Sequence, residues 1–219
     1  MQVLLIDLDG TLSDSAPGIL SSLRRAFADV GVPPLDERTE LSLLGPPFYE
    51  SLPPLVGADR VPAIIDGYRK YYNTAMFDTK IYDGIVDVLA DLRARDITLA
   101  VATSKPEAYA VPIVEHLGIT EFFEVIGGDA LDGSRDTKAK VIASVLERLG
   151  EPDPANVLML GDRSHDVDGA RAHAIDCLGA GWGYGTSGEL DGAVEVFATP
   201  RDLLGAHGRL FGDRGAAAS

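Results

Sequence analysis

The 219-residue sequence contains one cysteine and four histidines, so two common kinds of metal ligand are scarce. The single cysteine, Cys177, excludes an internal disulfide and a cysteine-based metal cluster. A lone cysteine is typical of proteins that work in a reducing cytoplasm. The four histidines are scattered along the chain, which gives no support to a histidine-based metal site.

Basic side chains are also scarce, with 19 Lys and Arg against 34 Asp and Glu and a net charge of −15. Such a surface repels nucleic acid and anionic membranes, and we expect neither as a partner. No apolar run approaches membrane-spanning length, and no basic segment precedes the first apolar run. We therefore expect a cytoplasmic protein without a signal peptide. We also expect a monomer, with a dimer as the alternative.

The N-terminal stretch 3–14 organises the rest of the chain. Four apolar residues, 3–6, predict a strand that is buried on both faces and ends at Asp7 and Asp9. Buried carboxylates are costly unless something pairs with them. The carboxyl edge of a parallel sheet is also where open α/β folds bind their ligands. A strand that ends in two acids at that edge is therefore a candidate site.

Two kinds of pattern divide the chain. Residues 15–81 have apolar side chains at helical spacing and no strand pattern. The remainder alternates helix and strand, which predicts an α/β, doubly wound parallel sheet in 1–14 and 82–219. The expected helices of this core are 85–95, 106–117, 137–149, 166–174 and 200–205, and its expected later strands are 97–102, 123–126, 157–160, 175–178 and 194–198. An all-helical insert at 15–81 would act as a lid over the end of the first strand.

Four motifs in order resemble the signature of the haloacid dehalogenase-like (HAD) superfamily of phosphohydrolases. They are the stretch from Asp7 to Thr11, the stretch Ala102-Thr103-Ser104-Lys105-Pro106, Lys138, and Gly161-Asp162-Arg163-Ser164-His165-Asp166. Further stretches, such as Tyr82-Asp83-Gly84, resemble the branch that holds phosphoglycolate phosphatase-like and 5′-nucleotidase-like hydrolases. The resemblance implies a Rossmann-like core with an inserted helical cap domain.

The two acids of the first motif suit the hydrolysis of a phosphate ester. Asp7 would attack phosphorus and form an aspartyl-phosphate. Asp9 would protonate the leaving alkoxide and then deprotonate the water that releases the phosphate. The resemblance implies the same two roles. Family members that act as dehalogenases lack the second acid, so Asp9 favours phosphoryl transfer.

Three further residues are candidates for phosphate binding. Thr103 and Ser104 follow a predicted strand and precede a helix, a position where hydroxyl and N–H groups bind phosphate oxygens. Taken alone, such a hydroxyl is more often a helix cap. Lys138 opens a predicted helix, where a lysine is unfavourable for the helix dipole. The resemblance implies that Lys138 pairs with the nucleophile and with the bound phosphate.

A second buried strand, 157–160, leads to Asp162. Together with Asp7 and the main-chain carbonyl of Asp9, Asp162 makes an all-oxygen site that suits Mg²⁺. Asp166 would hold Lys138 or a metal-bound water in position. Alternatively, Asp166 caps the helix that follows it, and both roles are compatible.

The sequence does not identify the residues that contact the variable part of the substrate. The segment Gly45-Pro46-Pro47 interrupts the helical insert where the caps of the family often carry specificity residues, so Gly45 is a candidate substrate contact. Lys105 and Arg135 lie near the expected phosphate site, but taken alone each is expected to be a solvated surface charge.

The sequence favours a Mg²⁺-dependent phosphatase for a small phosphorylated metabolite, such as a phosphoglycolate-like or nucleoside 5′-monophosphate-like ester. A sugar phosphomutase on the same core is the alternative. A non-enzymatic binding protein is a third hypothesis, which predicts the loss of a catalytic residue, and no such loss is seen.

Overall fold

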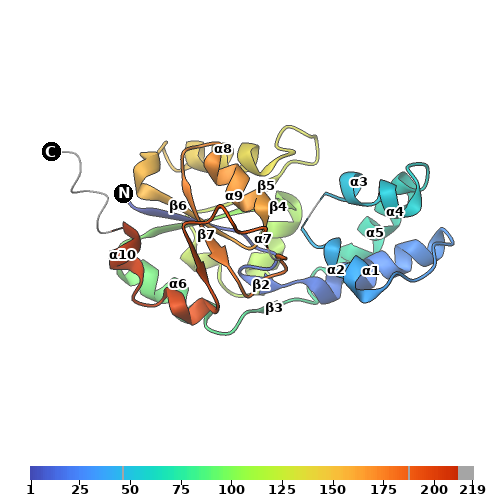
Figure 1. Ribbon diagram of the computed structural model, residues 1–219, viewed down its shortest axis with the longest axis horizontal. Helices are drawn as coiled ribbons and strands as arrows, with labels where there is room; N and C mark the ends of the chain where they lie inside the picture. Colours follow the sequence, from blue (N-terminus) through green and yellow to red (C-terminus); the bar gives the residue numbers. More distant parts are fainter. Residues whose placement is uncertain (46, 187, 212–219) are drawn as a thin grey trace. The chain divides into compact units, whose positions relative to one another are not determined.

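The computed structural model describes residues 1–45, 47–186 and 188–211, and its ribbon is shown in Figure 1. The chain divides into two compact units. The core unit comprises Met1–Ser13 and Ile81–Ser219, and the helical unit comprises Asp14–Lys80. The predicted boundaries, at 15 and 81, lie one residue further along the chain. The chain leaves and re-enters the core through two short strands, β2 (Ser13–Asp14) and β3 (Lys80–Ile81), which form a separate two-stranded sheet.

Among the described residues, six strands of the core unit form one sheet in the order β5-β4-β1-β6-β7-β8. Every neighbouring pair in this sheet is parallel. The strands are β1 (Val3–Ile6), β4 (Thr98–Pro106), β5 (Val125–Asp129), β6 (Val157–Gly161), β7 (Asp176–Ala180) and β8 (Glu195–Phe197). The predicted doubly wound parallel sheet is therefore confirmed. The strand order reverses beside β1, and open α/β sheets bind their ligands at such a switch point.

Helices cover both faces of the sheet, which explains why the central strands are apolar without alternation. They are α6 (Ile85–Ala94), α7 (Glu107–His116), α8 (Lys138–Arg148), α9 (Ser164–Arg171) and α10 (His207–Phe211), with 3₁₀ turns at Thr120–Phe122, Pro154–Asn156 and Pro200–Leu203. Val3 and Leu5 face the cluster formed with α8 and α9, and α6 lies on the opposite side of the sheet (Figure 1). This packing leaves the carboxyl ends of β1 and β6 side by side.

Some predicted elements differ from the structure. Strand β4 runs to Pro106, although the pattern predicted its end at 102, and its register with β5 shifts between Thr103 and Pro106. Strand β5 begins two residues later than expected and includes Gly127 and Gly128. Glycine is a poor strand former, so the sequence gives no strand signal there. The predicted helix 200–205 is a 3₁₀ turn, which precedes α10.

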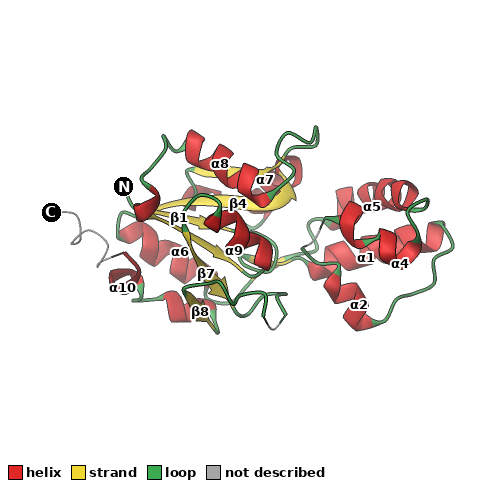
Figure 2. Cartoon of the chain, turned by 45° about the horizontal axis from the view of Figure 1, so that its top comes forward, coloured by secondary structure: helices red, strands yellow, loops and turns green. Residues whose placement is uncertain are grey.

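The helical unit consists of α1 (Ala16–Asp29), α2 (Glu37–Ser42), α3 (Phe48–Ser51), α4 (Pro53–Val56) and α5 (Val61–Ala75), which Figure 2 shows as coils. Helices α1 and α5 pack along their apolar faces, with Leu23 and Phe27 buried on α1 and Ile64 and Tyr72 buried on α5. Because both helices bury an apolar stripe, the unit has a hydrophobic core of its own.

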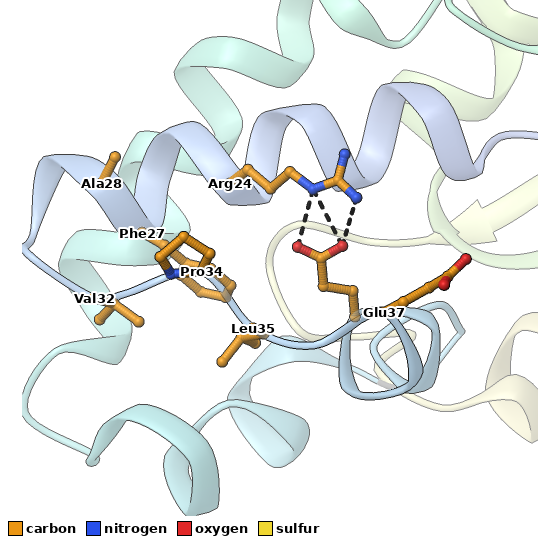
Figure 3. Close-up of a pocket in the computed structure, with 8 residues that line it drawn as sticks. Arg24, Phe27, Ala28, Val32, Pro34, Leu35 and Glu37 are labelled. Carbon is orange, nitrogen blue, oxygen red and sulfur yellow. Dashed lines mark hydrogen bonds and ion pairs between the residues drawn. The ribbon is translucent and has the colours of Figure 1, made fainter.

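One pocket of about 450 Å³ lies on the helical unit, between α1 and the segment that leads into α2 (Figure 3). Phe27, Val32 and Leu35 contribute apolar walls. Arg24 donates a hydrogen bond from Nε to Oε1 of Glu40 at 2.9 Å, so the charges of this pair compensate each other. None of the predicted site residues lines this pocket.

No helix in the described parts of the chain is both long and apolar enough to cross a membrane.

Candidate active site

Asp7 follows strand β1 directly and is buried. Its backbone N–H donates to the carbonyl oxygen of Leu160 at 2.9 Å, which continues the pairing with β6 and fixes the position of the side chain. Burial raises the pKa of the Asp7 carboxyl, and the nearby charge of Asp166 adds to the effect, whereas Lys138 opposes it. The sheet therefore holds a carboxylate where water solvates it poorly.

Lys138 lies between two of these acids. Its Nζ atom is 2.8 Å from Oδ1 of Asp7 and 2.7 Å from Oδ1 of Asp166. Burial alone would lower the pKa of Lys138, but the carboxylates of Asp166 and Asp7 outweigh burial and raise it. The structure thus brings Lys138 to the predicted nucleophile. It also places Asp166 against Lys138, as one of the two interpretations of Asp166 expected.

Asp166 has a second contact, which supports its other interpretation. Its Oδ2 atom accepts a hydrogen bond from the backbone N–H of Arg163 at 3.0 Å, in the capping box of α9. Gly161 is required beside it, because a Cβ atom there would lie 2.1 Å from Cγ of Asp166. The two carboxylate oxygens of Asp166 therefore serve the helix start and Lys138 together.

Asp162 follows strand β6 directly and is fully buried. Its Oδ1 atom accepts a hydrogen bond from the Thr11 hydroxyl at 3.2 Å, and its Oδ2 atom accepts one from the backbone N–H of Tyr184 at 2.7 Å. Burial, with the charges of Asp7 and Asp166, raises the pKa of Asp162 to about 8. The ionised form of such a carboxyl is unfavourable unless a nearby cation compensates its charge.

The donor set fits a divalent cation with a preference for oxygen. One ligand atom from each of Asp7, Asp162 and Asp166 lies within 4.8 Å of the others. With Lys138, these groups sum to a net charge of −2 when all three carboxylates are ionised. A buried cluster with that excess of negative charge is unfavourable by itself, and Mg²⁺ would balance it with the oxygen ligands that it prefers.

Thr103 and Ser104 lie near the carboxyl end of β4. Thr103 is buried, and its Oγ1 atom accepts a hydrogen bond from the backbone N–H of Lys105 at 3.2 Å. Since that contact uses Oγ1 as an acceptor, the hydroxyl proton of Thr103 stays available for donation to a phosphate oxygen. Ser104 is partly exposed. Their roles in substrate binding stay predictions.

The expectation that Lys105 is a solvated surface charge is wrong. Lys105 is buried, and its Nζ atom is 2.9 Å from Oδ2 of Asp9. The register shift between Thr103 and Pro106 occurs in the segment that carries Lys105. The sequence pattern could not predict this irregularity. Lys105 and Asp9 thus form a second carboxylate–lysine pair, beside the pair of Asp7 and Lys138.

Arg135 is also less solvated than expected. Its Nη2 atom is 3.2 Å from Oε2 of Glu107, and about a quarter of its side chain is exposed. Gly45 lies in the helical unit, in the turn between α2 and α3, with φ at 104°. Pro46 lies outside the described residues. The assignment of Gly45 to substrate binding stays a prediction.

Sequence reasoning did not single out the segment that follows β7. Trp182 donates from Nε1 to the carbonyl oxygen of Thr11 at 3.0 Å, and Tyr184 provides the N–H group that binds Asp162. A Cβ atom on Gly183 would lie 2.3 Å from Cβ of Asp162, so only glycine allows this approach. The alternation of glycine and aromatic residues in 181–185 is the signal that could have identified this segment.

Comparison with known proteins agrees with this geometry. A family model described as haloacid dehalogenase-like hydrolase matches residues 4–180. The tyrosine-protein kinase PtkA of Mycobacterium tuberculosis is 44% identical over 191 residues, which are 87% of this chain and 65% of that protein. The chain therefore spans less than two thirds of the length of that relative.

Two shorter relatives align over most of their length. A 5′-nucleotidase from Pseudomonas aeruginosa is 36% identical over 190 residues, or 85% of this chain and 86% of that protein. A phosphoglycolate phosphatase from Chromobacterium violaceum is 31% identical over 216 residues, or 93% of this chain and 96% of that protein.

Two solved structures resemble most of the chain. A predicted phosphatase from Clostridium acetobutylicum has a TM-score of 0.86 at 34% identity and covers 92% of this chain and 95% of its own. The structure of PtkA from Mycobacterium tuberculosis has a TM-score of 0.81 at 42% identity and covers 93% of this chain and 98% of its own.

Proposed function

Because the chain belongs to the haloacid dehalogenase-like hydrolase family, we propose that it is a Mg²⁺-dependent phosphatase of small phosphorylated metabolites. The observation that carries the proposal is the buried cluster of Asp7, Asp162, Asp166 and Lys138 at the carboxyl edge of the sheet. Evolution rarely maintains such an excess of buried charge without a function, because the cluster costs stability.

In this proposal Asp7 is the nucleophile. A carboxylate oxygen of Asp7 attacks phosphorus, the bond from phosphorus to the ester oxygen breaks, and an aspartyl-phosphate forms. Asp9 gives a proton to the leaving oxygen. It then takes a proton from the water that attacks the aspartyl-phosphate, so that Asp7 is regenerated and inorganic phosphate is released.

The remaining residues compensate charge on the phosphoryl group. Lys138 would donate to a phosphoryl oxygen while it holds Asp7, and the Thr103 hydroxyl and the N–H groups near Ser104 would donate to others. Asp7, Asp162 and the main-chain carbonyl of Asp9 would hold Mg²⁺. When bound, the ion neutralises charge that develops on the phosphoryl oxygens.

The proposed substrate class is a small anionic phosphate ester. The 5′-nucleotidase and the phosphoglycolate phosphatase that resemble the chain support this choice, since each aligns with most of the chain. The helical unit would act as the lid that selects the leaving group, with Gly45 as a candidate contact. A cytoplasmic location is part of the proposal, and the single cysteine supports it.

The test is phosphate release from phosphoglycolate, sugar phosphates, nucleoside 5′-monophosphates and p-nitrophenyl phosphate, with and without Mg²⁺. Asp7→Asn protein, purified in parallel, is the blank. We expect release that requires Mg²⁺ and is lost in the variant. If the folded wild-type protein released no phosphate from any ester, the proposed function would be wrong.

Phosphoryl transfer to tyrosine is a second candidate, and the 44% identity with PtkA is the observation that favours it. Asp7 would still accept the phosphoryl group, as in the phosphatase reaction. The donor would be a nucleoside triphosphate, and the final acceptor would be the phenol of a tyrosine in place of water. Incubation with a γ-labelled nucleoside triphosphate tests it. Label that stays on protein tyrosine after acid treatment would support transfer, and label that appears only in inorganic phosphate would contradict it.

The phosphomutase hypothesis needs a different experiment. It requires interconversion of sugar 1- and 6-phosphates without net release of phosphate. A product analysis of the sugar phosphate reactions separates this outcome from hydrolysis.

A further inference from the structure

Among the described residues of the core unit, Lys105 and Lys138 are the buried lysines, and each contacts one of the two acids of the first motif. Lys138 contacts Asp7, as the family resemblance implies. Lys105 contacts Asp9 at 2.9 Å, and only 5% of the Lys105 side chain is exposed. Burying an ammonium group is costly unless its partner repays the cost, so the position of Lys105 needs an explanation.

The local backbone is shaped so that Lys105 can turn inward. The register of β4 against β5 shifts between Thr103 and Pro106, where Lys105 lies. The β5 residue that passes this segment is Gly128, and a Cβ atom on it would lie 2.4 Å from the carbonyl oxygen of Lys105. Gly128 also donates its N–H to Oε2 of Glu107 at 3.3 Å. A side chain at position 128 would therefore displace the segment that carries Lys105.

The two carboxylate oxygens of Asp9 have different surroundings. Oδ2 is held by Lys105, whereas Oδ1 is buried and has no hydrogen-bond partner among the described residues. A lysine that held both oxygens would compete with the leaving group. A lysine that holds one oxygen fixes the orientation of the carboxyl group and leaves the other oxygen for proton transfer.

We propose that Lys105 is a positioning residue that holds Oδ2 of Asp9, so that Oδ1 is the atom that exchanges a proton with the leaving oxygen. This role rests on the proposed phosphatase function, in which Asp9 is the general acid. Lys105 itself neither gains nor loses a proton in the step. The proton passes from Oδ1 of Asp9 to the ester oxygen as the bond from phosphorus to that oxygen breaks.

The role has a consequence that a purely structural lysine would not produce. An alkoxide leaves only with help from an acid, whereas p-nitrophenolate is stable as an anion and needs little help. General acid catalysis contributes about 10²–10⁴-fold where it is needed. Misplacing Oδ1 should therefore slow the cleavage of alkyl esters and leave the aryl ester nearly unaffected.

The experiment measures kcat/KM of wild-type, Lys105→Met and Lys105→Arg protein at saturating Mg²⁺. The esters are phosphoglycolate and adenosine 5′-monophosphate, which are alkyl phosphates, and p-nitrophenyl phosphate. This constant covers the steps up to the aspartyl-phosphate, so hydrolysis of the intermediate does not enter. Lys140→Met is the matched control, because Lys140 lies on the exposed face of α8 and pairs only with Asp136 among the described contacts.

We expect Lys105→Met to lower kcat/KM by about 10–100-fold for both alkyl esters and by less than about threefold for the aryl ester. Lys105→Arg should recover part of the loss, and Lys140→Met should change neither value. Asp9→Asn should show the same selectivity, and adding Lys105→Met to it should cost little more, because both changes act on one step.

Three outcomes would overturn the role of Lys105. One is an equal loss for alkyl and aryl esters, which would indicate a structural role. Another is a loss for phosphoglycolate alone, which would indicate that Lys105 binds the carboxylate of that substrate. The third is full additivity with Asp9→Asn. Absence of activity in the wild-type protein would instead contradict the proposed function.

Partial unfolding of a variant does not affect the comparison of alkyl and aryl esters. The ratio of kcat/KM for two esters is measured on one preparation, and the fraction of active protein cancels from it. If Lys105→Met yields no active protein, the same ratio in Lys105→Gln and Lys105→Arg tests the proposal.

Discussion

At the scale of single residues, the buried acids Asp7, Asp162 and Asp166 are better explained by the binding of a cation than by a contribution to folding stability. Asp162 is fully buried beside two other acids, and its pKa is raised to about 8 mainly by burial. Only Lys138 offers an opposite charge within the cluster of Asp7, Asp162 and Asp166 described here. Functional sites often carry such local costs, because the same groups are needed for binding.

The change Asp162→Asn tests whether the buried carboxyl of Asp162 lowers folding stability. Without divalent ions, we expect the variant to be at least as stable as the wild type, because the change replaces a buried carboxyl whose ionised form is unfavourable there and alters little volume. At Mg²⁺ about 100 times its Kd, the wild type should gain about 2.7 kcal/mol in the free energy of unfolding, and the variant much less. Urea unfolding with EDTA and with Mg²⁺ measures both values.

The matched control is Asp168→Asn, since Asp168 is exposed on α9, the helix that follows Asp162, and pairs with Arg171. This control should respond to Mg²⁺ as the wild type does. A variant Asp162→Asn that gained as much from Mg²⁺ as the wild type would remove Asp162 from the ion site.

At the scale of elements, the approach of β4 to β5 depends on the absence of a side chain. Gly128 lies close to the carbonyl oxygen of Lys105 and to the backbone N of Glu107, at 2.4 and 2.7 Å from the position of its missing Cβ. Backbone atoms cannot move aside as the end of a flexible side chain can. The glycine thus links the sheet to the segment that pairs with Asp9.

Gly128→Ala should therefore lower the free energy of unfolding by about 1–3 kcal/mol, as overpacking does. Gly208→Ala is the control, because nothing lies within 4 Å of its added Cβ and it sits in helix α10. The control should change stability by less than about 1 kcal/mol. Chemical denaturation of both variants makes the comparison, and equal stabilities would contradict the close approach.

A second element-scale contact joins the segment after β7 to the start of α9. Arg163 and Glu189 form a largely buried ion pair, and Glu189 also accepts a hydrogen bond from the backbone N–H of Thr186 at 3.1 Å. Burial alone would raise the pKa of Glu189, but the Thr186 N–H and the Arg163 guanidinium outweigh it and lower the pKa to about 2. The contact therefore depends on ionised Glu189.

The lowered pKa of Glu189 determines how folding stability depends on pH. A carboxyl whose folded pKa is lowered stabilises the protein above its unfolded pKa of about 4.5, and that contribution is lost as the pH falls towards about 2. Glu189→Gln should lower stability at pH 7 by about 1.5–3 kcal/mol, as expected for hydrogen bonds to a charged group.

The difference between Glu189→Gln and the wild type should narrow as the pH falls below about 4.5. Unfolding curves at several pH values between 7 and the acid limit of the folded state measure this trend. A difference that stayed constant with pH would show that the ionised form of Glu189 does not contribute.

At the scale of the whole molecule, the net charge of −15 opposes the approach of an anionic ester. Local cations, namely Lys138, Lys105 and a bound divalent ion, act only at short range. Salt screens the long-range repulsion, and the screening length falls to about 10 Å at 0.1 M ionic strength.

We therefore expect kcat/KM for a phosphate ester to rise, by about twofold or more, as ionic strength increases at saturating Mg²⁺. Steady-state rates in a series of potassium chloride concentrations measure the slope. Potassium acetate at the same ionic strengths separates screening from specific inhibition by chloride. A falling kcat/KM in both salts would indicate an electropositive entrance and would contradict this expectation.

Much of the core was predictable from the chain alone. The strands β1 and β6 are predictable because each is a short apolar run that leads to an acid, and a parallel sheet that is covered on both faces requires such runs. The same reasoning placed Asp7 and Asp162 at one edge of the sheet. Elements that contain glycine were predicted less well, since Gly127 and Gly128 extend β5 for reasons of packing that lie on other strands and helices.

What the sequence by itself determined is the class of fold and the chemical type of the cluster, because apolar periodicity and the positions of acids are local properties. The family resemblance already implied that Lys138 meets Asp7, whereas the pairing of Lys105 with Asp9 was decided by the tertiary structure alone. Lys105 and Asp9 are far apart in the chain, and their pairing depends on the shift between β4 and β5. The support that Thr11 and Tyr184 give to Asp162 is likewise long-range, since it arises only when the ends of β1, β6 and β7 meet at one edge of the sheet.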